Sequence, residues 1–340
     1  MLRDTTSSAH LAQAPPREVF DAIAAALDAR IVGQFALKQR LLIALLCDGH
    51  VLVEGVPGIA KTTVVKTLAQ LVEADFHRIQ FTPDLLPADI TGTEVFRAES
   101  GTFEFRPGPL FRSLVLADEI NRAPAKVQSA LLEAMEERQV SVGRATFALP
   151  ALFMVMATQN PLEQDGTYPL PESQLDRFLL HIQVGYPAPD AEHAILQLAR
   201  EDAARAAAGE GANERGSVAA IASMKQVFAA RREVLALHMA AALERYLLEL
   251  VLATRNPGAY DAELAPLIRL GASPRASIGL DRAARAHAWL AGRDYVSPED
   301  IQAIAPDVLR HRLLLSYQAR ADSAGADEII ARLIGRVPVP

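Results

Sequence analysis

Short apolar runs alternate with amphipathic segments through the first half of the chain. The apolar runs have the length and side chains of buried strands, and they cover residues 51–53, 76–81, 114–117, 152–157 and 178–184. Between them, apolar side chains recur at helical spacing over residues 16–30, 37–47, 61–72 and 124–137. Strands that alternate with helices predict a mainly parallel sheet with helices on both faces, the α/β class of fold.

Two other segments alternate apolar and polar residues in the manner of β-hairpins. The first pairs residues 93–97 with 102–106 around Glu99-Ser100-Gly101, within a stretch (83–107) that has the character of an insertion. The second pairs residues 139–142 with 145–149 around Gly143-Arg144. We therefore expect two hairpins inserted into the α/β core.

After Pro189 the composition changes to alanine-rich helix, and no strand pattern appears. Helices are predicted over residues 224–237, 240–254 and 274–290, with one more that starts at Ser297. In Ser297-Pro-Glu-Asp300 the serine caps, the proline takes the first helical position and the aspartate completes a capping box. The small, charged and glycine-containing segment 203–216 predicts a flexible excursion. The expected organisation is a disordered tail (1–16), an α/β core (17–186) and an all-helical domain (187–340).

A phosphate-binding loop follows the first apolar strand. Residues 55–62 are Gly-Val-Pro-Gly-Ile-Ala-Lys-Thr, in which the two glycines let backbone N–H groups turn toward phosphates. Lys61 would reach the β/γ-phosphates, the Thr62 hydroxyl could ligate Mg²⁺, and the helix start adds its positive dipole end. Ala60 stands where glycine usually precedes the lysine. The candidate nucleotide-binding residues are Val32, Gly33, Gly55, Val56, Pro57, Gly58, Ile59, Ala60, Lys61, Thr62, Thr63 and Arg275.

An acidic pair, Asp118-Glu119, directly follows the apolar strand at 114–117. Hydrolysis of a bound nucleotide needs one carboxylate near the metal and another that orients the attacking water. We assign Asp118 to the metal, together with Thr62, and Glu119 to the water. The ordinary alternative is a solvated acidic pair at the start of a loop, which the preceding phosphate loop and apolar strand disfavour.

Three further polar residues are candidates for the same chemistry. Asn160 ends the strand at 152–157 and could bond the water or the γ-phosphate, although a turn residue before proline is a common alternative. Arg177 could reach a neighbouring subunit's γ-phosphate, or it could pair with Asp176. Arg275, after Ser273-Pro274 at a predicted helix start, could contact nucleotide from the second domain, or it could be a solvated first-turn arginine.

Composition narrows the remaining possibilities. The 34 basic and 41 acidic residues give a formal charge of −7, which argues against a broad nucleic-acid surface. Cys47 is the only cysteine, so an intrachain disulfide and a cysteine zinc cluster are excluded, and the eight histidines lack metal-ligand spacing. No apolar run approaches the ~20 residues of a membrane span, and the first residues do not resemble a secretory signal. We expect a cytoplasmic protein.

The order of these motifs resembles that of AAA+ ATPases and, more narrowly, of the MoxR family, over about residues 17–315. Residues 55–62 are similar to the family's Walker A motif, in which alanine before the lysine is usual. The other similar segments are residues 116–122 (Walker B), 157–161 (sensor 1), 166–178 (the segment before the arginine finger), 271–275 (sensor 2) and 292–300 (a late helix of the lid). The two predicted hairpins match the helix-2 insert and the pre-sensor-1 hairpin of that group.

This resemblance implies an αβα AAA+ core with a helical lid, ATP and Mg²⁺ as cofactors, and Glu119, Asn160 and Arg177 as catalytic residues. It also implies a hexameric ring with ATP at the subunit interfaces. Such a ring would be a chaperone-like remodeller that matures or activates client complexes, often beside a protein with a von Willebrand factor A domain.

Two alternatives stay open at this point, an AAA+ motor that acts on nucleic acid and the motor subunit of a chelatase-like complex. The hairpins could face a central pore, where a nucleic-acid motor would need basic residues. In the first hairpin, however, glutamates balance arginines; these residues are Glu94, Glu99 and Glu104 against Arg97 and Arg106.

Overall fold

The computed structural model describes residues 14–56, 61–161, 166–207 and 220–340. They form two compact units. Unit 1 comprises the described residues up to 42, 52–168 and 183–229, and unit 2 comprises 43–51, 169–182 and 230–340. Most of the predicted tail and residues 208–216 of the predicted excursion lie outside the described residues, and the domain boundary at 186/187 stays a prediction.

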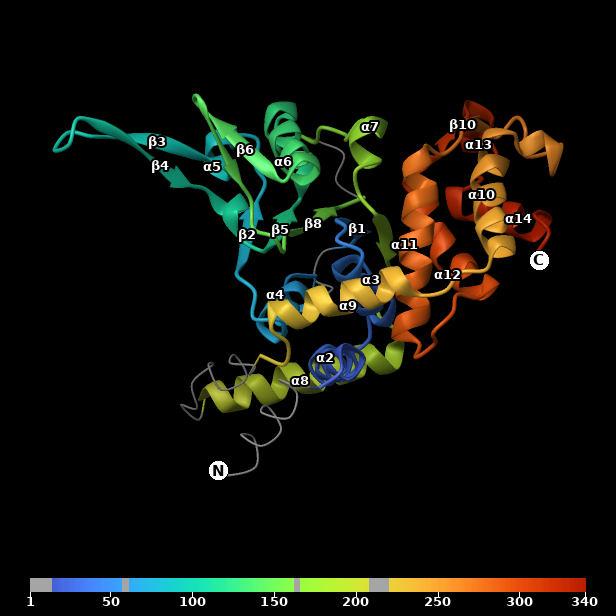
Figure 1. The fold of residues 1–340 in the computed structure, drawn as a ribbon, viewed down its shortest axis with the longest axis horizontal. Helices are drawn as coiled ribbons and strands as arrows, with labels where there is room; N and C mark the ends of the chain where they lie inside the picture. The colour runs from blue at the N-terminus through green and yellow to red at the C-terminus, as the bar shows by residue number, and fades with distance from the viewer. Residues whose placement is uncertain (1–13, 57–60, 162–165, 208–219) are drawn as a thin grey trace. The chain divides into compact units, whose positions relative to one another are not determined.

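A five-stranded sheet has the order β2-β5-β8-β1-β9 (Figure 1). Its strands are β1 (Val51–Gly55), β2 (Phe76–Gln80), β5 (Leu114–Asp118), β8 (Met154–Gln159) and β9 (Leu180–Val184). β5 pairs in parallel with β2 on one side and with β8 on the other. All four apolar residues of β5 are fully buried, as expected for a parallel strand covered on both faces. The α/β prediction is confirmed.

The helices that precede, separate and follow these strands agree with the predicted helical segments, except that the short helix over residues 87–91 was not predicted. They are α2 (Pro16–Arg30), α3 (Phe35–Leu46), α4 (Lys61–Leu71), α5 (Pro87–Thr91), α6 (Ala125–Glu137), α8 (Pro189–Ala207) and α9 (Met224–Ala236). One prediction needs correction, because α8 continues through residues 203–207, where a flexible excursion was expected. Residues 203–207 are four alanines and one arginine, which are good helix formers and extend the helix there.

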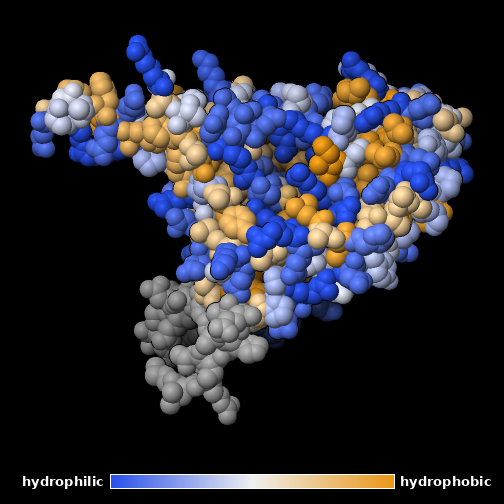
Figure 2. All heavy atoms as spheres, viewed as in Figure 1, coloured by the Kyte–Doolittle hydropathy of each residue, from blue (hydrophilic) through white to orange (hydrophobic). Residues whose placement is uncertain are grey.

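Both predicted hairpins are present in unit 1. β3 (Gly92–Arg97) pairs antiparallel with β4 (Thr102–Pro107), and β6 (Gln139–Val142) with β7 (Ala145–Ala148). Phe105 of the first hairpin stacks on Phe147 of the second, with ring centroids 3.9 Å apart. Phe96 and Phe103 are exposed on the first hairpin, over which Figure 2 shows apolar and charged side chains intermixed.

Unit 2 is built mainly from helices. They are α7 (Glu172–Leu175), α10 (Ala241–Arg255), α11 (Pro274–Leu290), α12 (Pro298–Leu309), α13 (Tyr317–Ala321) and α14 (Ala326–Arg336). The helical prediction for residues after 189 is confirmed with one addition. β10 (Ile268–Leu270) pairs antiparallel with β11 (Leu314–Leu315), and strands this short carry no readable alternation.

The predicted capping box at the start of α12 is confirmed. The Ser297 N–H and hydroxyl both donate to Asp300 Oδ2, at 2.8 and 3.0 Å. Asp300 is fully buried, and its Oδ1 accepts from His287 Nδ1 at 2.6 Å and from Arg293. Burial alone would raise the pKa of Asp300, but the hydrogen bonds from His287 and Ser297 and the charge of Arg293 lower it overall. This carboxylate therefore organises the start of α12 as an ion.

Replacing this buried carboxylate should weaken the fold. Asp300→Asn leaves Arg293 without its buried counter-charge, so we expect the free energy of unfolding at pH 7 to fall by about 3–5 kcal/mol. Because the folded-state pKa of Asp300 is lowered, its contribution is fully present above its unfolded pKa and disappears as pH falls through the lower folded value. Denaturant titrations of parent and variant should thus converge as the pH falls below the ordinary pKa of an aspartate. Asp294→Asn, at an exposed neighbour, is the control; an equal loss there would contradict the assignment.

Candidate nucleotide site

The two ends of the predicted phosphate loop lie where strand β1 ends and helix α4 begins. The Lys61 ammonium at the helix start donates to the Gly55 carbonyl at the strand end, with a 2.6 Å separation. Burial lowers the pKa of Lys61, whereas the charges of Asp118, Glu119 and Glu54 act to raise it. Lys61 therefore sits in the field of the predicted acidic pair. The loop residues between, Pro57, Gly58, Ile59 and Ala60, lie outside the described residues.

Asp118 is the last residue of β5, and both of its carboxylate oxygens are engaged. The Thr158 hydroxyl donates to Oδ1 at 2.6 Å. Arg78 donates to Oδ2 from Nε at 3.0 Å and from Nη2 at 2.6 Å. Arg78 reaches it from β2, whose last residue, Gln80, lies opposite Asp118 in the parallel ladder. The carboxylate assigned to the metal is thus held in one orientation by two neighbouring strands.

Glu119 has a left-handed backbone conformation, with φ of 57° and ψ of 49°. This conformation costs a non-glycine residue about 1–2 kcal/mol. The Glu119 N–H donates to the Thr158 hydroxyl at 2.9 Å, which stabilises the turn. Its carboxylate accepts from Gln80 Nε2 at 2.9 Å and lies 3.3 Å from Arg122 Nε. One threonine hydroxyl therefore joins the backbone of Glu119 to the carboxylate of Asp118.

The other candidates of unit 1 lie at the ends of elements. Asn160 directly follows β8 and is half-buried, so it ends the strand next to that of Asp118. Thr62 and Thr63 occupy the first turn of α4. Val56 directly follows β1, and Val32 and Gly33 lie between α2 and α3, where Gly33 has a φ of +68°.

The two candidate arginines belong to unit 2. Arg177 follows α7 and is half-buried. Arg275 is in the first turn of α11, and its Nη1 lies 3.7 Å from Asp176 Oδ2. Asp176 also pairs with the buried Arg312, at 2.8 Å. The assignments of Arg177 and Arg275 to nucleotide stay predictions.

Three functional candidates were missed by sequence reasoning, Thr158, Gln80 and Arg78. The threonine lies inside the segment that resembles sensor 1, Gln80 lies at the end of the predicted strand 76–81, and Arg78 lies in its middle. For Thr158 and Gln80, a polar side chain at the carboxyl end of a strand was the available signal. It was not used because the neighbour of each strand in the sheet was unknown.

Comparisons with known proteins agree with this geometry. A family model described as the ATPase family associated with various cellular activities (AAA) matches residues 50–180, and an AAA lid domain model matches residues 261–333. The chain is 47% identical over 311 residues to Chaperone MoxR1 of Mycobacterium tuberculosis, which covers 91% of this chain and 79% of that protein. It is 35% identical over 333 residues to Protein MoxR of Paracoccus denitrificans, covering 93% of this chain and 95% of that protein.

A solved structure extends the likeness to three dimensions. A candidate ATPase from Cytophaga hutchinsonii superposes with a TM-score of 0.87 at 43% identity, covering 98% of this chain and 97% of that chain. The parallel sheet, the lysine at the start of α4, the acidic pair that ends β5 and the matched lid define an AAA+ ATPase. The relatives narrow this class further, and the chain belongs to the MoxR family.

These findings also bear on the remaining expectations. Neither alternative, a nucleic-acid motor or a chelatase subunit, is favoured by the relatives that match most of the chain. Among the described helices, none combines the length and the hydropathy needed to cross a bilayer.

Loss of the Thr158 hydroxyl should lower ATP turnover even when the shape of the side chain is kept. Thr158→Val keeps the shape but leaves the Asp118 carboxylate and the Glu119 N–H without this buried partner. We expect ATP turnover to fall about 10- to 100-fold, the usual cost of losing a group that orients a site residue. Thr158→Ser retains the hydroxyl and should stay within a few-fold of the parent in a phosphate-release assay. Equal activities of the valine and serine variants would contradict this role.

Proposed function

We propose that this protein is a chaperone-like MoxR ATPase that remodels or activates a client protein complex at the expense of ATP. The observation that carries the proposal is the juxtaposition of Lys61 with Asp118 and Glu119. A cation at the start of a helix and two carboxylates at the end of a strand are the groups that bind nucleoside triphosphates and activate water. The chaperone role is supported by the relative from Mycobacterium tuberculosis, which is named Chaperone MoxR1.

Each residue has a separate task in this scheme. Lys61 and the backbone of residues 55–62 bind the β/γ-phosphates. Glu119 orients the attacking water, and Asn160 bonds the water or the γ-phosphate. Gln80 donates a hydrogen bond to Oε2 of the Glu119 carboxylate, and Arg122 forms an ion pair with the same oxygen.

The residues assigned to Mg²⁺ fit its chemistry. The Thr62 hydroxyl and the Asp118 carboxylate are hard oxygen ligands, and Mg²⁺ is commonly held by one or two such groups with phosphates and water. Among the described residues no cluster of three or more His, Cys, Asp and Glu forms a metal cage, so these two oxygens are the proposed protein ligands. When bound, the ion would neutralise phosphate charge; Arg78 supplies a positive charge to Asp118 in the structure described.

The proposed assembly is a hexameric ring in the cytoplasm. In such a ring Arg177 reaches the ATP site of the neighbouring subunit, and Arg275 contacts nucleotide from the lid. A partner with a von Willebrand factor A domain is proposed beside the client. Nucleic acid is not a proposed partner, because glutamates balance the arginines of the exposed hairpin and the relatives that match most of the chain do not favour it.

Binding and hydrolysis should separate by residue. Lys61→Ala removes the charge on the phosphates, so the Kd for ATP should rise about 10- to 100-fold. Glu119→Gln leaves the phosphate and metal ligands in place, so binding should persist while turnover falls by at least about 100-fold. Glu137→Gln, an exposed change in the same unit, is the control for both assays. If Glu119→Gln hydrolysed ATP at the parent rate, the assignment of Glu119 to the attacking water would be wrong.

The same hydrolysis-blocked variant tests the remodelling role. Tagged Glu119→Gln with bound ATP should retain a client that Lys61→Ala does not, and mass spectrometry of the two eluates gives its identity. A client recovered equally with Lys61→Ala would show that its capture does not depend on ATP.

The action of Arg177 between subunits can be tested by mixing inactive proteins. Loss of an arginine supplied to the γ-phosphate costs roughly 10³–10⁵ in turnover, so Arg177→Ala should be inactive but still bind ATP. Mixed with Glu119→Gln, it should regain part of the activity, because some interfaces then join an intact Glu119 to an intact Arg177. The matched control mixes Arg177→Ala with the Arg177→Ala/Glu119→Gln double variant, which cannot supply the arginine. No recovery in confirmed mixed rings would favour a role for Arg177 within its own chain.

A further inference from the structure

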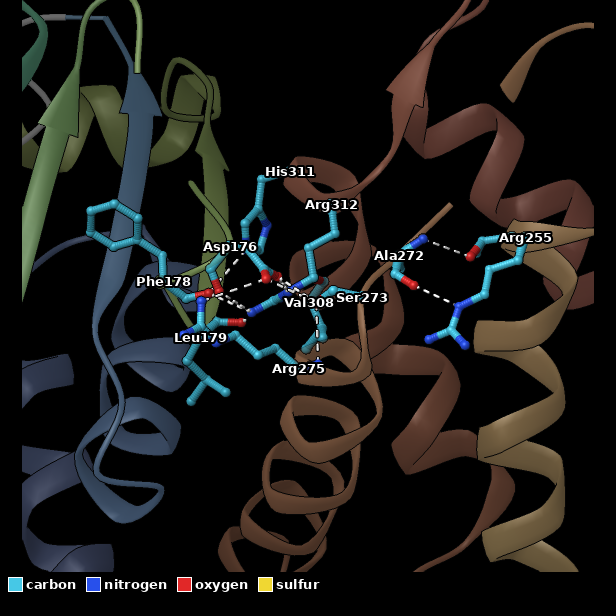
Figure 3. Close-up of polar contacts among 11 residues, drawn as sticks. Asp176, Phe178, Leu179, Arg255, Ala272, Ser273, Arg275, Val308, His311 and Arg312 are labelled. Carbon is cyan, nitrogen blue, oxygen red and sulfur yellow. Dashed lines mark hydrogen bonds and ion pairs between the residues drawn. The ribbon is translucent and has the colours of Figure 1, made fainter. Parts of the chain in front are cut away.

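A single carboxylate connects the two candidate arginines of unit 2. Asp176 lies between α7 and β9, directly before Arg177, and its carboxylate meets side chains from two distant segments (Figure 3). Arg312 donates from Nε to Oδ1 at 2.8 Å. The Ser273 hydroxyl lies 2.9 Å from both Oδ1 and Oδ2. These contacts lie within one compact unit.

Arg312 fixes the main chain on both sides of Arg177. Its Nη2 donates to the carbonyl of Asp176 at 3.2 Å and to that of Phe178 at 2.7 Å. Its Nη1 donates to the Leu179 carbonyl at 3.2 Å and to the Val308 carbonyl. With the bond from Nε to the Asp176 carboxylate, all five N–H groups of the guanidinium are used. The Arg312 side chain is only 3% exposed, so water does not replace these bonds readily.

The other end of the cluster is the start of α11. Ser273 is its N-cap, and the Ser273 hydroxyl accepts from the Arg275 N–H at 3.2 Å. The Arg275 guanidinium itself lies 3.7 Å from Asp176 Oδ2 and is 44% exposed. The Asp176 carboxylate is therefore bound both to the helix start that carries Arg275 and to the residue that holds the backbone of Arg177.

We propose that Asp176 is a positioning residue that couples Arg177 to Arg275. A shift of the α11 start on nucleotide binding would pull on the Asp176 carboxylate and so move the backbone of Arg177. This inference rests on the proposed function, in which Arg177 serves the neighbouring ATP site and Arg275 the site of its own subunit. Through Asp176, nucleotide binding at one site would then change the position of the arginine that serves the next site around the ring.

A double-mutant cycle tests whether Asp176 acts through Arg177. Asp176→Asn keeps the size of the side chain and removes its charge, and we expect kcat to fall about 10- to 100-fold with the Kd for ATP unchanged within threefold. In an Arg177→Ala background the same change should lower single-turnover hydrolysis of radiolabelled ATP by less than twofold. Asp294→Asn is the control. If the double variant lost activity by the product of the two single losses, as partial unfolding would give, the proposal would be overturned.

A milder variant, at Ser273, tests the link from Asp176 to the start of α11 and keeps the ion pair between Asp176 and Arg312. Ser273→Ala removes the hydroxyl between the Asp176 carboxylate and the α11 start, and Ser273→Thr retains it. We expect Ser273→Ala to keep kcat within threefold while the Hill coefficient for ATP falls from above 1 to 1. An unchanged Hill coefficient in Ser273→Ala, or a parent value of 1, would overturn the coupling. Parent-like turnover by Arg177→Ala would instead overturn the proposed function, so the two failures are distinguishable.

Discussion

Burial of the central strands on both faces is the constraint on which the site depends. The apolar residues of β5 and the first five residues of β8 are buried, so polar groups are tolerated mainly where these strands leave the core. Asp118 and Asn160 lie at those exits. Thr158 is a polar residue that is buried. Its hydroxyl is tolerated there because it accepts from the Glu119 N–H and donates to the Asp118 carboxylate at the end of the adjacent strand. The sheet thereby places Asp118, Glu119 and Asn160 at the carboxyl ends of two neighbouring strands.

Each carboxylate of the acidic pair is contacted by basic or amide side chains of nearby residues. Arg78 neutralises Asp118, while Gln80 and Arg122 contact Glu119. β2 therefore carries two of the side chains that hold the acidic pair of β5.

Much of the fold could be predicted because its signals are local. Helical and strand periodicity, the hairpin turns and the capping box at Ser297 each depend on residues a few positions apart. The site was predicted in the order of its motifs but not in its contacts. Thr158 lies 40 residues from Asp118, and Arg312 lies 136 residues from Asp176, so their roles depend on the tertiary fold. The strands β10 and β11 escaped prediction because they are short.

One buried histidine lies beside the segment that Arg312 binds, and its surroundings decide its charge. His311 Nε2 lies 3.0 Å from the Phe178 carbonyl, in the same segment that Arg312 binds. Burial lowers the pKa of His311 well below 6.5, and the charges of Arg312, His181 and Arg310 act in the same direction, against the hydrogen bond to Phe178. The neutral form of the imidazole is therefore the favoured one, and it adds no further positive charge to the segment that Arg312 binds.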